Sequence, residues 1–224
     1  MVKRKVEWKT YLAIGIITFI FFLSGILTGL FISKAKVDTL VEQVNQLGIN
    51  LRETETIMLF MSLYGKDACD MLYEQLDALN NESEEIRKDV AFYETTKRVE
   101  DPSYIATKKN YMSIMLMHWL YQEKANKECQ INSTIILFFY SNKYCEICKD
   151  QGTVLTYMKQ KYADKIVIFT FDVDLDVRMI NYLGKLYGFE VRENPVLIIR
   201  NTKYEKFLSR NDIEKILCDI GTIC

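Results

Sequence analysis

The stretch Tyr11–Ile32 contains 22 residues and no charged side chain. As a helix it would be about 33 Å long, which is enough to cross the hydrocarbon core of a bilayer. A cleavable signal peptide is the alternative interpretation. However, the stretch is longer than the apolar region of a typical signal peptide, and Thr28-Gly29-Leu30-Phe31 is a poor cleavage site. The sequence therefore predicts a single transmembrane helix over residues 11–32.

The positive charges on the two sides of this stretch predict its orientation. Four basic residues precede it and only two follow it closely: Lys3, Arg4, Lys5 and Lys9, then Lys34 and Lys36. Because the more positive flank stays in the cytoplasm, we expect residues 1–10 to be cytoplasmic. Residues 33–224 would lie on the other side of the cell membrane. All six cysteines would then be in a compartment where disulfides persist.

The composition narrows the classes of partner. The chain has 224 residues, 49% of them apolar, and a net charge of −1. This length allows one ordinary core and a smaller accessory element. The chain has no block of basic residues of the kind that binds nucleic acid. We therefore expect protein partners and no nucleic acid.

Residues 33–128 are predicted to form a helical stalk or bundle. Apolar residues at alternating steps of three and four form a heptad seam: Val37, Leu40, Val44, Leu47, Leu51, Thr54, Met58 and Met61. This spacing is typical of a coiled coil. Gly25 and Gly29 would let two copies of the apolar helix approach closely. A parallel homodimer would use both features. Alternatively, the seam packs against later helices of the same chain, and the sequence leaves both interpretations open.

Two further helices are predicted over residues 66–98 and 103–127, separated by Asp101-Pro102, which ends a helix. These helices could form a small bundle with the seam helix. Alternatively, the second of them could dock on the sheet that follows.

Residues 129–224 are predicted to form an α/β domain in the order β-α-β-α-β-β-α. The expected strands are 134–140, 166–172, 196–200 and 204–209, and the expected helices are 145–162, 176–187 and 211–217. A right-handed crossover would make the first two strands parallel. The last two strands would form an antiparallel hairpin.

Cys145 and Cys148 stand where the first of these strands gives way to a helix. Unpaired N–H groups and a partial positive charge at a helix start stabilise a thiolate. Cys145 would therefore be a nucleophile with a low pKa. Cys148 lies one turn further on the same helix face, so it could close a disulfide with Cys145 and release a bound partner.

A zinc site is the alternative for such a pair, but it requires a second pair of ligands with similar spacing. Cys218 and Cys224 are six residues apart, and His118 is the only histidine. The sequence therefore predicts redox chemistry with no metal and no organic cofactor.

Three segments resemble the thioredoxin-like family: residues 139–149 with the CxxC pair, residues 165–174, and residues 187–199 with Pro195. The resemblance covers roughly Thr134–Leu217. It implies a thioredoxin fold and a thiol–disulfide oxidoreductase that acts on protein thiols or disulfides and exchanges electrons with a partner protein. It also implies that Cys145 attacks, that Cys148 resolves, and that Pro195 is a cis-proline beside them.

Two departures from the family pattern bear on the direction of the reaction. The dipeptide Glu146-Ile147 differs from those of thioredoxins and of strongly oxidising relatives, so the direction stays open. The first strand, apolar from Ile135 to Phe139, lacks the buried acid of cytosolic thioredoxins.

A non-catalytic scaffold or interaction module in a membrane assembly is the alternative function.

Four cysteines lie outside the CxxC pair: Cys69, Cys129, Cys218 and Cys224. The preferred pairing joins Cys69 to Cys129, which closes about sixty residues and would be worth about 4 kcal/mol in the chain-entropy model. Cys218 and Cys224 could pair locally. Free thiols packed as small apolar residues are the alternative for each pair.

Overall fold

The computed structural model describes residues 8–64, 68–95 and 101–224. The chain divides into two compact units, residues 1–42 and residues 43–224. The basic residues Lys3, Arg4 and Lys5, which contribute to the predicted orientation, lie outside the described residues.

The first unit contains the N-terminal part of α1 (Trp8–Tyr64). Its segment Tyr11–Gly29 is long and apolar enough to cross a membrane, and none of it is buried. A Cβ added at Gly25 or Gly29 would meet no atom within 4 Å. A membrane span and an N-terminal signal sequence both pass this test of length and composition, so the transmembrane helix stays a prediction.

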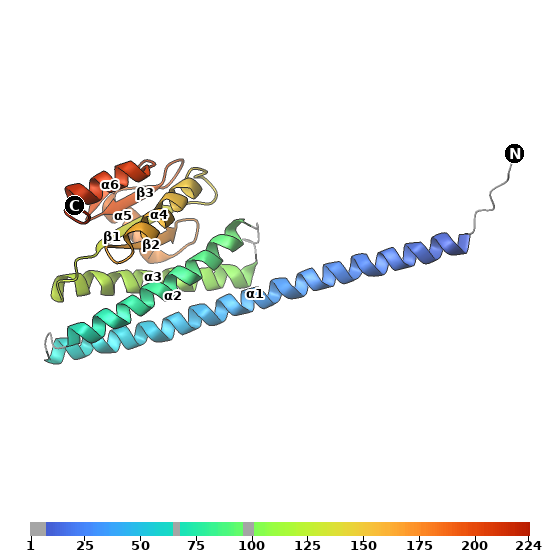
Figure 1. Ribbon diagram of the computed structural model, residues 1–224, viewed down its shortest axis with the longest axis horizontal. Coiled ribbons are helices and arrows are strands. Elements are labelled where there is room, and N and C mark those ends of the chain that lie inside the picture. The colour runs from blue at the N-terminus through green and yellow to red at the C-terminus, as the bar shows by residue number, and fades with distance from the viewer. Residues whose placement is uncertain (1–7, 65–67, 96–100) are drawn as a thin grey trace. The chain divides into compact units, whose positions relative to one another are not determined.

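The second unit opens with three helices: α1 from residue 43 onward, α2 (Cys69–Thr95) and α3 (Pro102–Glu128). The side-chain amide of Asn50 donates to Glu82 Oε2 at 2.7 Å, and that of Gln75 donates to the Asn50 carbonyl at 3.0 Å. A Cβ at Gly48 would be 3.3 Å from Ile114 Cδ1 of α3. This part of α1 therefore packs against both later helices, and Figure 1 shows α2 running back beside it.

The heptad seam is buried within its own chain. Its members in the second unit are at most 5% exposed: Val44, Leu47, Leu51, Thr54, Met58 and Met61. Since the chain already covers these side chains, they are not available to a second copy. The interpretation of the seam as a homodimer contact is therefore wrong for these residues. The heptad spacing identifies an apolar face but not the helix that covers it.

The helix α3 begins at a side-chain cap and ends against the sheet domain. The Asp101 carboxylate accepts hydrogen bonds from the N–H groups of Ser103 and Tyr104 at 2.8 and 3.4 Å. Pro102 occupies the first turn, where its missing N–H costs nothing. Further along α3, the His118 ring packs against the ring of Phe169 in β2 in an edge-to-face arrangement, with ring centroids 5.1 Å apart. Thus α3 belongs to the helical bundle and also docks on the sheet.

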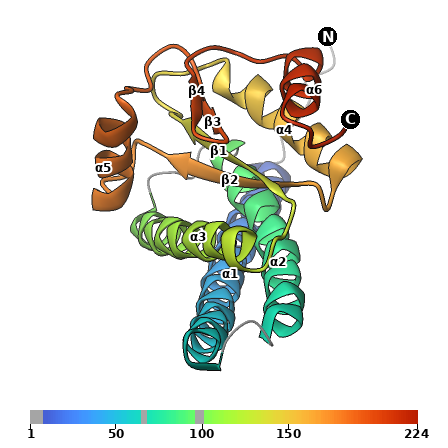
Figure 2. The ribbon, with the colours of Figure 1, turned by 90° about the vertical axis from the view of Figure 1, so that its left-hand side faces the viewer.

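The sheet has four strands in the order β2-β1-β3-β4. Their bounds are β1 (Thr134–Tyr140), β2 (Ile166–Asp172), β3 (Val196–Ile199) and β4 (Thr202–Tyr204). β1 and β2 are parallel, with Tyr140 opposite Asp172, and the pairs β1–β3 and β3–β4 are antiparallel. With α4 (Cys148–Tyr162), α5 (Arg178–Tyr187) and α6 (Arg210–Asp219), the predicted order β-α-β-α-β-β-α is confirmed. Figure 2 shows α3 crossing beneath β2.

The last hairpin is tighter than predicted. Arg200 and Asn201 form its two-residue turn with φ values of 45° and 67°, so β4 begins at Thr202 and the predicted strand over residues 204–209 is wrong. Left-handed backbone at both turn positions matches the twist of a hairpin. Asparagine tolerates that region, but arginine gives no sequence signal for it.

Candidate active site

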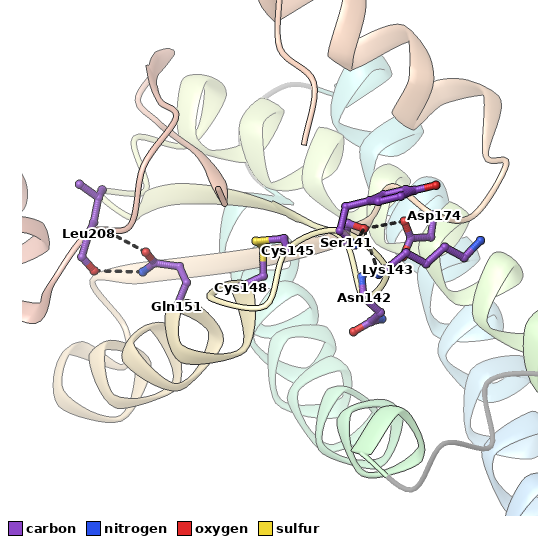
Figure 3. The surroundings of a disulfide bond; sticks show 9 residues. Ser141, Asn142, Lys143, Cys145, Cys148, Gln151, Asp174 and Leu208 are labelled. Atoms are coloured by element: carbon purple, nitrogen blue, oxygen red, sulfur yellow. Dashed lines mark hydrogen bonds between the residues drawn. A yellow bond between two sulfur atoms is a disulfide. The ribbon is translucent and has the colours of Figure 1, made fainter. Parts of the chain in front are cut away.

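Cys145 and Cys148 form a disulfide, with an S–S distance of 2.00 Å and a Cα–Cα distance of 5.3 Å. Figure 3 shows the pair between the loop after β1 and the first turn of α4. The helix α4 begins at Cys148, not at Cys145 as predicted. The difference arises because the Cys148 N–H donates to the Cys145 carbonyl three residues back, at 3.3 Å. That is a tight turn leading into the helix rather than helix proper.

The two cysteines are buried, while their neighbours are exposed. Cys145 is 5% exposed and Cys148 is 4% exposed. By contrast, Tyr144 and Ile147, which adjoin them in sequence, are 69% and 37% exposed. The pair therefore lies just beneath a surface formed by large side chains, through which a partner would reach the sulfur atoms.

The loop of residues 141–144, which leads into Cys145, is held by one carboxylate. Asp174 accepts hydrogen bonds from the Ser141 hydroxyl at 2.7 Å, the Asn142 N–H at 2.8 Å and the Lys143 N–H at 3.1 Å. Ser141 Oγ in turn accepts from the N–H groups of Lys143 and Tyr144 at 3.1 and 3.0 Å. Figure 3 shows these groups converging on Asp174. The backbone that presents Cys145 is thus fixed by five hydrogen bonds.

Ser141 and Asp174 were missed as site residues by sequence reasoning. The resemblance includes Asp174 within residues 165–174 but gives it no role. The absence of an acid from Ile135–Phe139 holds in the structure, where these five residues are buried in β1. The buried acid of this domain is instead Asp172, the last residue of β2, which is 2% exposed.

Gln151 joins α4 to the segment before α6. Its side chain is fully buried. Its Nε2 donates to the Leu208 carbonyl at 3.2 Å, and its Oε1 accepts the Leu208 N–H at 2.7 Å. Because Gln151 lies three residues after Cys148, this double hydrogen bond fixes the turn of α4 that carries Cys148 (Figure 3).

Pro195 is buried and immediately precedes β3. Among the described residues no peptide bond is cis, so the prediction that Pro195 is a cis-proline is wrong. The trans form is the ordinary state of an X–Pro bond, favoured by about 0.5–1 kcal/mol. That Pro195 acts beside the cysteine pair stays a prediction.

A cleft of about 810 Å³ is lined in part by Tyr144, the residue before Cys145. Its lining comes from the loop, from the segment after β2, from α5 and the residues that follow it, and from one residue after β4: Lys143, Tyr144, Val173, Asp174, Ile180, Asn181, Gly184, Lys185, Gly188, Phe189, Glu190, Val191 and Glu205. Both charge signs and several apolar side chains are present in it. The cleft therefore reaches the loop before Cys145, and neither cysteine of the pair is among its lining residues.

The remaining cysteines also pair. Cys69 is bonded to Cys129, 60 residues further on, which links the start of α2 to the end of α3. Cys218 is bonded to Cys224. Within residues 8–64, 68–95 and 101–224, no group of three or more His, Cys, Asp or Glu side chains is arranged to hold a metal ion.

Comparisons with known proteins point to thioredoxins. No family model matches the chain. The chain is 27% identical over 84 residues to thioredoxin 2 of Plasmodium berghei, and the match covers 37% of this chain and 51% of that relative. The chain thus spans about half the length of the curated relative it matches.

Three solved structures are also similar. A malaria-parasite thioredoxin-2, described as a component of the protein secretion machinery, is 22% identical and has a TM-score of 0.33, covering 39% of this chain and 84% of its own. Chloroplastic thioredoxin z is 17% identical and has a TM-score of 0.34, covering 44% of this chain and 88% of its own. The germline-specific thioredoxin Deadhead of Drosophila melanogaster is 22% identical and has a TM-score of 0.31, covering 47% of this chain and 94% of its own. At these low TM-scores, the thioredoxin-like fold of this chain rests on its own strand order and register.

Proposed function

We propose that this chain is a thiol–disulfide oxidoreductase that exchanges disulfides with protein substrates through Cys145 and Cys148. The observation that carries the proposal is the closed Cys145–Cys148 disulfide at the junction of β1 and α4. A loop of three residues constrains an unfolded chain far less than a long loop does. This bond therefore has a small structural role and is suited to opening and closing.

The reaction balances in either direction. In reduction, the Cys145 thiolate attacks one sulfur of a substrate disulfide and expels the other sulfur as a thiolate, giving a mixed disulfide at Cys145. The Cys148 thiolate then attacks Cys145 Sγ and releases the second substrate sulfur. The substrate gains two electrons and two protons, and the Cys145–Cys148 disulfide is formed. Oxidation of a substrate dithiol is the reverse, and a redox partner protein restores the starting state.

The cleft beside Tyr144 supports a protein substrate. An extended segment on either side of a substrate cysteine would lie along α5 and the residues after it, opposite Lys143 and Tyr144. The cleft could contact substrate charges of either sign. Acidic side chains would meet Lys143 and Lys185, and basic side chains would meet Glu190 and Glu205. The exposed ring of Tyr144, which lines the cleft and precedes Cys145, would contact the substrate.

We propose further that residues 11–32 anchor the protein in the cell membrane, with residues 1–10 in the cytoplasm and the redox domain outside it. The apolar segment and the positive charges before it support this arrangement. The Cys69–Cys129 and Cys218–Cys224 bonds would then be structural disulfides. Protease digestion of sealed vesicles tests the orientation: the redox domain should be cut only from the non-cytoplasmic side.

Insulin reduction by the full chain in detergent tests the proposed activity. The wild type should reduce insulin in the presence of a thiol donor, and Cys145→Ala should fall to the uncatalysed rate. The matched control is Cys218→Ser/Cys224→Ser, which removes another disulfide and should keep the activity. Wild-type rates from Cys145→Ala would reject the oxidoreductase and favour the scaffold interpretation.

A further inference from the structure

A buried lysine from the helical bundle reaches the end of the sheet beside the cysteine loop. Lys108 of α3 is 2% exposed. Its ammonium group pairs with Glu94 Oε1 of α2 at 2.5 Å and with Asp172 Oδ2 at the end of β2. The Tyr140 hydroxyl, from the end of β1, also donates to Glu94 Oε1, at 2.8 Å. Two helices of the bundle and two strands of the sheet therefore meet at one cation.

The charges of this cluster keep Lys108 protonated. Burial alone lowers the pKa of Lys108, but the neighbouring Glu94 and Asp172 carboxylates outweigh it, so the pKa is raised. Burial raises the pKa of Asp172, and the Lys108 charge and its hydrogen bond lower it again, leaving it raised overall. Asp172 is thus a buried carboxylate whose charged form is stabilised mainly by Lys108.

Asp172 transmits this dependence to the loop before Cys145. Its Oδ2 accepts a hydrogen bond from Asn142 Nδ2 at 3.3 Å, in addition to the one from Lys108. Its Oδ1 accepts the Asp174 N–H at 2.8 Å. Asp174 is the residue whose carboxylate holds three groups of the loop. An ionised Asp172 can accept at both oxygens, whereas a protonated one must donate from one of them.

We propose that Lys108 is a positioning residue of the redox site: by holding Asp172 as a double acceptor, it fixes Asn142 and Asp174, and through them the loop that presents Cys145. The inference rests on the proposed function and adds that the helical bundle contributes to the site. The charged or titratable groups around Asp172 are Lys108 and Tyr104 from α3, Glu94 from α2, Tyr140 from β1 and Asp174 after β2.

Removing the Lys108 charge should raise the pKa of Asp172 further and favour its protonated form, because the attraction that lowers this pKa is lost while burial remains. One loop contact, from Asn142 or from the Asp174 N–H, then loses its acceptor. A hydrogen bond to a charged group is worth enough to change a rate by about tenfold or more. Raising the pH should ionise Asp172 again and restore that contact.

The test compares Lys108→Met with Asp172→Asn and with Lys109→Met, the adjacent lysine on α3, in the full chain. Lys108→Met should reduce insulin about tenfold more slowly than the wild type at about pH 7, with the deficit shrinking toward about pH 9. Asp172→Asn mimics the protonated acid, so its deficit should not change with pH. Lys109→Met should match the wild type. Amide hydrogen exchange at residues 142–144 should be faster in the first two variants.

A wild-type rate and wild-type amide protection in folded Lys108→Met would overturn the inference, as would a deficit equal at both pH values. If Lys108→Met does not fold, Asn142→Ala and Asp172→Asn decide together. The first cuts one link at an exposed side chain, and the second changes the acceptor of both links. A slower rate and faster amide exchange in both variants support the inference, and wild-type values in both overturn it. Failure of the proposed function would look different: the wild type itself would not reduce insulin, although its loop amides were protected.

Discussion

The disulfides Cys145–Cys148 and Cys69–Cys129 lie in the same unit and differ in what each one closes. The first spans three residues and the second 60. A disulfide proposed to react with protein substrates would be expected to be the more exposed of the two. Instead, Cys145 and Cys148 are 5% and 4% exposed, whereas Cys69 and Cys129 are only half-buried. Loop length and exposure therefore rank the two disulfides differently, and the proposed roles follow loop length.

The comparison of the two disulfides is tested most strongly by Cys148→Ser, for which we expect the largest change in the turnover rate. Without the Cys148 thiolate, the mixed disulfide at Cys145 can be released only by an external thiol. Turnover should therefore fall strongly, and a covalent adduct with the substrate should accumulate when no thiol donor is added. Non-reducing electrophoresis would detect the adduct as a band that disappears with reductant. The control is Cys129→Ser, which should form no adduct through the site. Turnover by Cys148→Ser at the wild-type rate would contradict the proposed roles.

The next largest effect is on stability, in Cys69→Ser/Cys129→Ser. Opening a loop of 60 residues should lower the free energy of unfolding by about 4 kcal/mol in the chain-entropy model. Urea denaturation of the full chain in detergent would measure it, and insulin reduction below the transition should be retained. An unchanged midpoint would mean that the bond does not stabilise the fold. Lost activity in the still-folded variant would mean that the two disulfides are not separable.

A change at His118 would test the contact between α3 and the sheet without altering a cysteine. It is 1% exposed, packs on Phe169, and burial lowers its pKa to about 3. The unfolded chain binds this proton near pH 6.5, so the stability it contributes is present above that pH and is lost as the pH falls toward 3. Between pH 7 and pH 4 the loss should be about 3 kcal/mol.

His118→Phe should remove that loss, because this is the only histidine of the chain. Urea denaturation at the two pH values, for wild type and variant, measures the difference. Equal slopes against pH in both proteins would show that the ring is already solvated or protonated in the folded state.

The sequence predicts the elements of the redox domain well because its strands are continuous apolar runs. β1 and β2 have the predicted bounds, since both are buried and bordered by polar residues. The seam of α1 shows the limit of such patterns. Its period shows that one face is covered, but the helices that cover it come from residues 69–128, and periodicity carries no information on partners.

The candidate site also has a part that the sequence predicts and a part that it does not. Cys145 and Cys148 are predictable because their spacing is itself the signal. Lys108 is separated from Glu94 by 14 residues and from Asp172 by 64, and a lysine in a helix is ordinarily solvated. Only the packing of α3 against β2 makes it buried and paired. The cis-proline prediction came from resemblance alone, and no physical property of residues 193–195 requires that isomer.

The smallest expected effect belongs to Cys218–Cys224, which closes six residues. The chain-entropy model gives about 2 kcal/mol for so short a loop. Other contacts already hold this segment: the Thr222 N–H donates to the Leu217 carbonyl at 2.8 Å, and the Thr222 and Thr134 hydroxyls are 2.6 Å apart. Cys218→Ser/Cys224→Ser should therefore lower the free energy of unfolding by no more than about 2 kcal/mol. A loss as large as that of Cys69→Ser/Cys129→Ser in the same urea titration would show that loop length does not rank these disulfides.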